Sequence, residues 1–285
     1  MKKVRGYNSA EYTGYVFSFS IRQNEKTGKK RANIGIRDEK MNNVAYVTMY
    51  ESPNLKYGDQ NVTLLELKKI FMDEDDNPRH ILATFSGIVH DNTYTSNVTK
   101  KTVTNVESIA FRVKPCSDEN KQQIMFNVTG IVDSIREVDD GESYLVKIGS
   151  ITLDKEKNPN GVSYNRIKIS EEAKEKWDDL GVDKGDQITI RGYNLNVLQL
   201  DEFGMADMDA KAVKELRGIK IGQYVPNDDL EDYESVYLAT KKAAVDGSTE
   251  KKVVKKEEPK KKDPVDDPDL PFDNGVEVND EDLFD

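Results

Sequence analysis

The first strand-like stretch of the chain reads Thr13-Gly14-Tyr15-Val16-Phe17-Ser18-Phe19-Ser20-Ile21. Its large apolar side chains recur at every second position, which is the period of a β-strand with one face in a core. The phrase returns in altered form as Thr129-Gly130-Ile131-Val132-Asp133-Ser134, again at the start of a run of alternating side chains. A repeated first strand supports a chain that contains the same small β unit twice.

Each unit is expected to contain three strands, then a helix, then two further strands. In the first unit, strand patterns lie at residues 15–21, 31–37, 44–50, 81–90 and 106–113, with a helix at 64–71 behind the capping box Thr63-Leu64-Leu65-Glu66. In the second unit, strand patterns lie at residues 126–138, 144–153, 162–169, 188–198 and 219–225, with helices predicted at 171–180 and 207–216.

A unit of about a hundred residues with this order suits the oligonucleotide-binding (OB) barrel, which holds its ligand across strands two and three and the loops beside them. The predicted fold class is therefore mainly β, with two small five-stranded OB-type barrels in tandem. We place the first barrel at residues 1–114, a linker at 115–123 and the second barrel at 124–225. Residues 226–285 are predicted to form a disordered acidic tail.

The negative charge of the chain is concentrated in this tail. Residues 226–285 hold 19 acidic and 9 basic side chains, so they carry a net charge of −10 out of −11 for the whole chain. The remaining 225 residues are close to neutral, and a local basic groove is compatible with them. The pI of 4.9 therefore says little about the folded part.

The sequence offers few residues for catalysis. With one cysteine and two histidines, it cannot build the usual Cys/His zinc site, and it has no phosphate-binding loop. We expect neither a metal nor a cofactor, and a binding protein rather than an enzyme. There is no apolar run that would cross a membrane and no secretion signal, so we expect a cytoplasmic protein of a bacterial cell or of a phage-infected host.

Cations and aromatic rings meet on the strands that bind ligand in an OB barrel. Single-stranded nucleic acid is held by cations along its backbone and by aromatic faces under its bases. The candidate DNA-binding residues in the first unit are Lys29, Lys30, Arg31, Arg37, Tyr46, Tyr50, Tyr94, Lys100 and Lys101. Those in the second unit are Tyr164, Arg166, Lys168, Arg191 and Tyr193. We expect Tyr15, Phe17 and Phe19 to belong to the core, because aromatic strand residues usually pack.

The tail resembles a known family at its acidic tips. Asp266-Asp267-Pro268-Asp269-Leu270-Pro271-Phe272 resembles the Pro-Phe-ended tip of bacterial single-stranded DNA-binding proteins, and Asp280-Glu281-Asp282-Leu283-Phe284-Asp285 resembles the tails of bacteriophage members. In those proteins an OB body coats single strands and the tail recruits replication and repair enzymes. The resemblance implies the partner-docking residues Asp266, Asp267, Asp269, Leu270, Pro271, Phe272, Asp282, Leu283 and Phe284.

The leading hypothesis is a sequence-tolerant single-stranded DNA-binding protein of replication, recombination or repair. Its tail would compete with DNA for the groove and recruit partner enzymes, and self-association is compatible with the sequence. The alternative is an acidic-tailed viral scaffold or interaction protein that binds no nucleic acid. A metal-dependent nuclease stays open as a third hypothesis, because carboxylates are abundant although no catalytic pair stands out.

Overall fold

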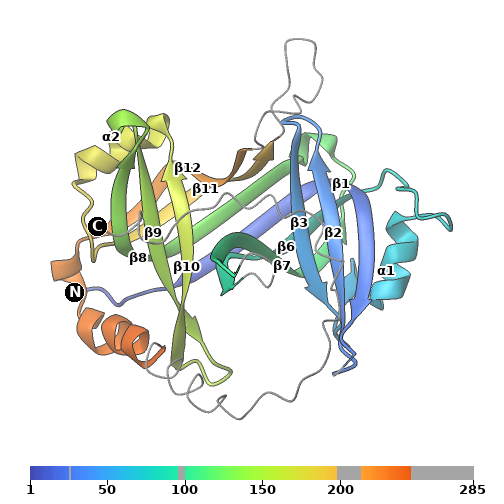
Figure 1. Cartoon of the computed structure of the whole chain (residues 1–285), viewed down its shortest axis with the longest axis horizontal. Coiled ribbons are helices and arrows are strands. Elements are labelled where there is room, and N and C mark those ends of the chain that lie inside the picture. Colours follow the sequence, from blue (N-terminus) through green and yellow to red (C-terminus); the bar gives the residue numbers. More distant parts are fainter. Residues whose placement is uncertain (26, 96–99, 198–212, 245–285) are drawn as a thin grey trace.

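The computed structural model describes residues 1–25, 27–95, 100–197 and 213–244. These residues form two strand-rich halves that lie side by side (Figure 1). The first half comprises β1 (Tyr7–Gln23), β2 (Lys30–Asp38), β3 (Asn43–Tyr50), β4 (Lys56–Tyr57), β5 (Gln60–Asn61), α1 (Leu64–Phe71), β6 (Leu82–Thr95) and β7 (Thr102–Pro115). The second half comprises β8 (Gln123–Val138), β9 (Ser143–Leu153), β10 (Pro159–Ile169), α2 (Glu171–Leu180), β11 (Gln187–Val197) and β12 (Val213–Val225).

Five strands close into a ring in each half. In the first half, β1 pairs antiparallel with β2 and β6, β2 pairs with β3, and β6 pairs with β7. A parallel contact between β3 and β7 closes the ring. The second half repeats this scheme with β8, β9, β10, β11 and β12, and the parallel contact joins β10 to β12. The predicted fold class, mainly β with two five-stranded OB-type units in tandem, is confirmed.

Both predicted helix starts have the caps that their sequences indicate. The Thr63 side chain accepts a hydrogen bond from the Glu66 backbone, and the Glu66 side chain accepts one from the Thr63 backbone, which completes the capping box before α1. Ser170 caps α2 through the Ala173 backbone. Each helix stands between the third and fourth strands of its ring, and the buried side chains of both helices belong to one continuous apolar core.

The repeated phrase has the same structural place in both halves. Phe17 and Asp133 are each the extra residue of a β-bulge in the first strand of the ring. Thr13 and Thr129 each share a hydrogen bond with a threonine of the fourth ring strand, at 2.9 Å and 2.8 Å between the hydroxyl oxygens. These matching details support the inference of a repeated unit.

The halves are joined through their first strands, which cross the middle of the molecule (Figure 1). The N-terminal part of β1 pairs antiparallel with the N-terminal part of β8, and Ala10 lies opposite Phe126. These two numbers differ by 116, as do those of Thr13 and Thr129. Because corresponding positions pair with one another, the halves are related by an approximate two-fold axis through this ribbon.

A buried polar cluster fixes the joint between the halves. The Tyr12 hydroxyl lies 2.8 Å from the Ser108 hydroxyl, and the Asn194 amide donates to both, at 3.0 Å and 3.3 Å. Asn43 donates in turn to the Asn194 carbonyl at 2.9 Å. The cluster therefore ties β1, β3 and β7 of the first half to β11 of the second.

Two expectations from the sequence differ from the structure. The helix predicted at residues 207–216 overlaps β12, because Val213–Val225 pairs with both β10 and β11; residues 207–212 lie outside the described part. Here Leu216 and Gly218 are buried at strand spacing, and this period outweighs the helical one.

Residues 226–244, which the sequence assigned to the tail, are part of the folded body. They form η3 (Asn227–Asp229), the π-helical turn η4 (Tyr233–Leu238) and a final helical stretch at 239–244. Leu230 and Tyr237 are buried in a second apolar cluster with Ile131 and Val225. A short 3-10 turn, η1 (Glu119–Lys121), lies in the expected linker; the division into domains stays a prediction.

Candidate nucleic-acid interface

The outer face of β2 and β3 presents two tyrosines to solvent. Tyr46 lies opposite Gly35 and Tyr50 lies opposite Arg31 in the antiparallel pairing of these strands. The tyrosines are 42% and 47% exposed, whereas their neighbours Val47 and Met49 are buried in the core. Exposed aromatic side chains that gather on one sheet face often mark a binding surface, so this face is the first candidate surface.

Phe17 extends this aromatic surface instead of entering the core. As the extra residue of the bulge in β1, it turns outward and lies over Gly35, where a Cβ atom would collide with its ring. Its ring meets that of Tyr46 edge to face, with 5.8 Å between centroids. The expectation of a core position was therefore wrong for Phe17, whereas Tyr15 and Phe19 are buried as expected.

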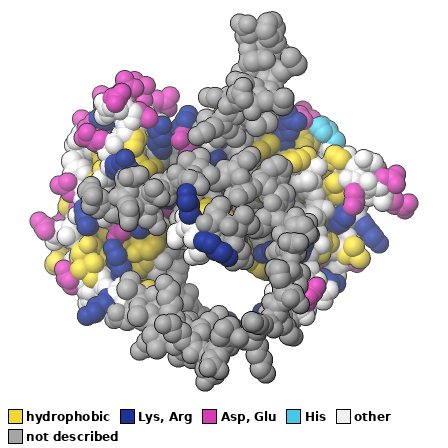
Figure 2. Space-filling view, viewed as in Figure 1, with side chains coloured by type: hydrophobic (Ala, Val, Ile, Leu, Met, Phe, Trp, Pro, Cys, Tyr) yellow, Lys and Arg dark blue, Asp and Glu magenta, His cyan; other side chains and the backbone are white. Residues whose placement is uncertain are grey.

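Basic side chains stand at one end of this face. Lys29 and Lys30 line a surface hollow with Gly28, Tyr50 and Glu51. Within the described residues, Lys29, Lys30 and Arg31 are exposed and form no ion pair. In Figure 2 acidic side chains lie mostly around the outer rim of the molecule. The structure thus brings three of the predicted cations and Tyr50 together.

The other predicted residues of the first half lie apart from this cluster. Arg37 is at the opposite end of β2, where it donates to the Asn42 side chain at 3.2 Å. Tyr94 lies near the tip of the β6–β7 hairpin, 40% exposed, and its hydroxyl accepts from Asn105 at 3.1 Å. Lys100 and Lys101 are exposed at the same tip.

In the second half, three predicted residues share the outer face of β10, and all are engaged within the chain. The Tyr164 ring lies under the Lys147 ammonium at 4.4 Å, and burial raises its pKa to about 12. Arg166 pairs with Asp91 of the first half at 3.0 Å. Lys168 pairs with Asp139 at 2.6 Å, and this hydrogen bond lowers the pKa of Asp139.

Arg191 and Tyr193 belong to another surface. They lie on β11, which is separated from β10 in the ring by β12 on one side and by β8 and β9 on the other. Arg191 is exposed and approaches the Met125 sulfur at 3.9 Å. The predicted residues of the second half therefore do not form one site.

Phe111 is a candidate that sequence reasoning missed. It is 59% exposed and is the extra residue of a bulge in β7, opposite Ser86 and Gly87 of β6. β3 and β7 run parallel, with Met49 opposite Ala110, so Phe111 follows at the level of Tyr50. The bulge shifts the alternation at this point, and no local pattern in the sequence could have indicated which face Phe111 takes.

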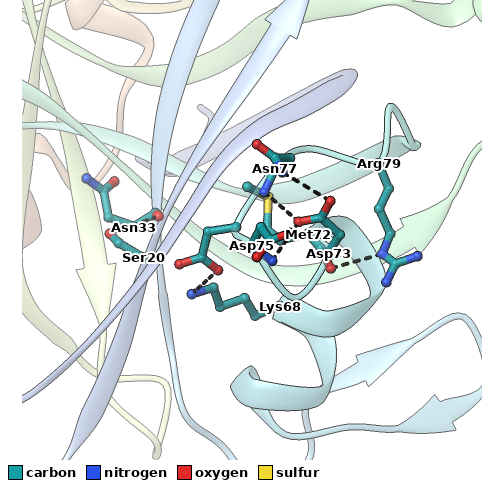
Figure 3. Close-up of polar contacts among 9 residues, drawn as sticks. Ser20, Asn33, Lys68, Met72, Asp73, Asp75, Asn77 and Arg79 are labelled. Atoms are coloured by element: carbon teal, nitrogen blue, oxygen red, sulfur yellow. Dashed lines mark hydrogen bonds and ion pairs between the residues drawn. The ribbon is translucent and has the colours of Figure 1, made fainter.

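The acidic turn after α1 uses its carboxylates within the chain (Figure 3). Asp73 accepts hydrogen bonds from the backbones of Asp75 and Asn77 at 2.9 Å and 2.8 Å, and the Asn77 bond lowers its pKa. Lys68 pairs with Asp76 at 2.7 Å. Among the described residues, no group of three or more His, Cys, Asp or Glu side chains could hold a metal ion.

The partner-docking residues predicted in the tail lie outside the described part, and so do all residues after Ala244. None of the helices that the structure describes is long and apolar enough to span a membrane.

Comparison with known proteins finds no matching family model and no matching curated protein. The wild-type single-stranded DNA binding protein from Thermus aquaticus matches with a TM-score of 0.47 and 13% identity, over 78% of this chain and 95% of its own. A deletion mutant of that protein matches with a TM-score of 0.47 and 12% identity, over 78% of this chain and 96% of its own. A likeness at this level carries no conclusion about what this chain binds.

Proposed function

We propose that this protein binds single-stranded nucleic acid, without strong sequence preference, across the outer face of β1, β2 and β3. One observation carries the proposal: Tyr46 and Tyr50 stand exposed on β3, beside the exposed cations Lys29, Lys30 and Arg31. Rings and cations together match the two parts of a single strand, its bases and its phosphates.

The physical roles divide along the face. Tyr46, supported at its edge by Phe17, offers a ring on which a base stacks, and stacking is worth about 1–3 kcal/mol per base. Lys29, Lys30 and Arg31 neutralise phosphates and release counterions. Since every base has a π face and every nucleotide a phosphate, this surface tolerates any sequence.

The finer proposal rests on the sequence. DNA as the strand, a role in replication, recombination or repair, and recruitment of enzymes by the acidic tail follow from the resemblance of the tail tips. The same resemblance supports a bacterial or phage-infected cytoplasm and a role that involves no catalysis. The alternative is a viral scaffold without nucleic-acid binding, and it is favoured if the titration below detects no binding.

The test is a fluorescence-anisotropy titration of a labelled thirty-residue oligothymidylate with the full chain across salt concentrations. We expect log affinity to fall against log salt with a slope of about −2 if three phosphates are contacted. Tyr46→Ala should weaken binding by about 5- to 150-fold, the loss of one stacked base. Tyr7→Ala is the matched control, because Tyr7 is 55% exposed on the joining ribbon, outside the proposed face.

Equal affinity of the Tyr46→Ala and Tyr7→Ala variants for the oligonucleotide would refute the proposed location of the binding site. If neither the full chain nor a chain ending at Ala244 binds in a salt-dependent way, the proposed nucleic-acid binding is refuted. The scaffold hypothesis then remains. Tighter binding by the chain ending at Ala244 is the result expected if the tail competes for the groove.

A further inference from the structure

The second half contains a counterpart of the proposed face. Phe17 and Asp133 occupy matching bulges, and the next residues, Ser18 and Ser134, lie opposite Gly35 and Lys147. Gly35 lies opposite Tyr46 on β3, and Lys147 opposite Arg166 on β10. The outer face of β8, β9 and β10 therefore corresponds, position by position, to the face that we propose for the nucleic acid.

Among the described residues, the counterpart face has ion pairs where the first face has exposed rings and cations without an ion pair. Where the first half has the Phe17 ring, the second has the carboxylate of Asp133, which pairs with Lys147 at 3.8 Å and also with Lys241. A carboxylate in this position repels phosphate and offsets part of the positive charge of the two lysines beside it. Arg166, the counterpart of Tyr46, is held by Asp91.

The chain also covers this face with its own residues. We call residues 226–244 the closing segment. Its Tyr237 is 1% exposed and lies against Gly149 of β9, where a Cβ atom would collide with the tyrosine hydroxyl. Tyr237 and Leu230 pack with Ile131 of β8, and Val162 of β10 packs against this cluster. In the register above, Gly149 corresponds to Arg37, so Tyr237 covers one end of this face. Lys241 of the same segment reaches Asp133, the counterpart of Phe17.

Hydrogen bonds hold the closing segment at its start. The Lys2 backbone donates to the Asp229 carbonyl at 2.7 Å, and the Glu231 backbone donates back to Lys2 at 3.0 Å. The Val4 backbone donates to the Asp232 carboxylate at 2.7 Å. We call residues 2–5 the N-terminal strap. The closing segment is therefore held by backbone hydrogen bonds to the strap at one edge and by the buried cluster beneath it.

We propose that each chain offers a nucleic-acid strand one sheet face, that of the first half, and that the closing segment keeps the second face shut while the strand is bound. The proposal rests on the proposed function and adds to it the number of sites. A single OB unit engages roughly 4–16 nucleotides, so one chain should have one short footprint, not two.

The test is hydrogen–deuterium exchange of the full chain with and without saturating thirty-residue oligothymidylate. We expect slower exchange in β2 and β3 on binding, and unchanged exchange in β9, β10 and residues 233–241. Faster exchange at 233–241 together with slower exchange in β9 and β10 would overturn the single face and leave nucleic-acid binding standing. Unchanged exchange everywhere would overturn the proposed function and this proposal with it.

Stoichiometry gives an independent measurement. Titration with a ten-residue oligothymidylate, short enough for one face, should saturate at one oligonucleotide per chain. Saturation at two per chain would contradict the proposal even if the exchange pattern agreed with it. The Lys168→Ala variant is the control for a cation on the closed face, where Lys168 pairs with Asp139. We expect its affinity to stay within about twofold of the parent, because a cation that contacts no phosphate releases no counterions on binding.

Discussion

At the scale of single residues, Asp91 shows the cost of a carboxylate between the halves. Its side chain is 6% exposed, and burial raises its pKa although Arg166 acts in the opposite direction. A folded-state pKa above the unfolded value means that stability is lost as pH rises through the folded pKa. We therefore expect Asp91→Asn to be more stable than the parent at pH 7 and to lose this advantage as the pH falls towards about 4, in urea unfolding.

The control for this prediction is Asp91→Ala. The asparagine oxygen can still accept from the Arg166 guanidinium, whereas alanine leaves that cation without its acceptor. Asp91→Ala should therefore cost about 1–3 kcal/mol at both pH values. An advantage of Asp91→Asn that grows on acidification would contradict the argument.

At the scale of elements, two glycines of the fourth ring strands, Gly87 and Gly192, lie opposite bulges in the fifth ring strands. A Cβ atom at Gly87 would collide with the carbonyl of Ile109, and one at Gly192 with the carbonyl of Arg217. Since these atoms are backbone, they cannot move aside cheaply. We expect Gly87→Ala and Gly192→Ala each to cost about 1–3 kcal/mol in urea unfolding. In the control Gly161→Ala, the new Cβ would meet only the Thr152 hydroxyl at 3.0 Å; an equal loss in all three variants would refute the prediction.

The elements that could be predicted from the sequence are those with local signals. Thr63 and Ser170 mark helix starts that the structure confirms, and alternation indicated the strands. Phe17 escaped prediction because a bulge, set by pairing with β2, reverses the face that alternation assigns to it. Long-range pairing also limits prediction of the candidate site. Arg166 carries the expected positive charge, but it forms an ion pair with Asp91 of the other half.

At the scale of the whole molecule, the closing segment decides where the chain can be shortened. A chain ending at Ala244 keeps Leu230 and Tyr237 in the second apolar cluster, whereas one ending at Val225 uncovers Ile131. Burial of each large apolar side chain is worth about 1.5–3 kcal/mol, so ending at Val225 should cost roughly 3–6 kcal/mol. Thermal unfolding of the two truncated chains checks this, and equal midpoints would show that the segment contributes nothing.

The composition of residues 226–285, taken as one block, did not indicate that residues 226–244 are folded. Residues 226–285 are acidic as a block, yet their first part contains Leu230, Tyr233 and Tyr237 close to helical spacing. Their burial depends on a surface made by β8, β9 and β10, far away in sequence, and on Val4 at the other end of the chain. Such a contact has no signature within a window of residues.

The N-terminal strap is synthesised long before the segment with which it pairs. Lys2 leaves the ribosome before its partner Asp229, which follows 227 residues later. At about 5–20 residues per second, the strap waits roughly 10–45 s for that partner. The first ring is complete by Pro115 and can form early, whereas the sheet of the second half emerges with its outer surface bare. That surface can therefore be covered only after residues 226–244 have been synthesised.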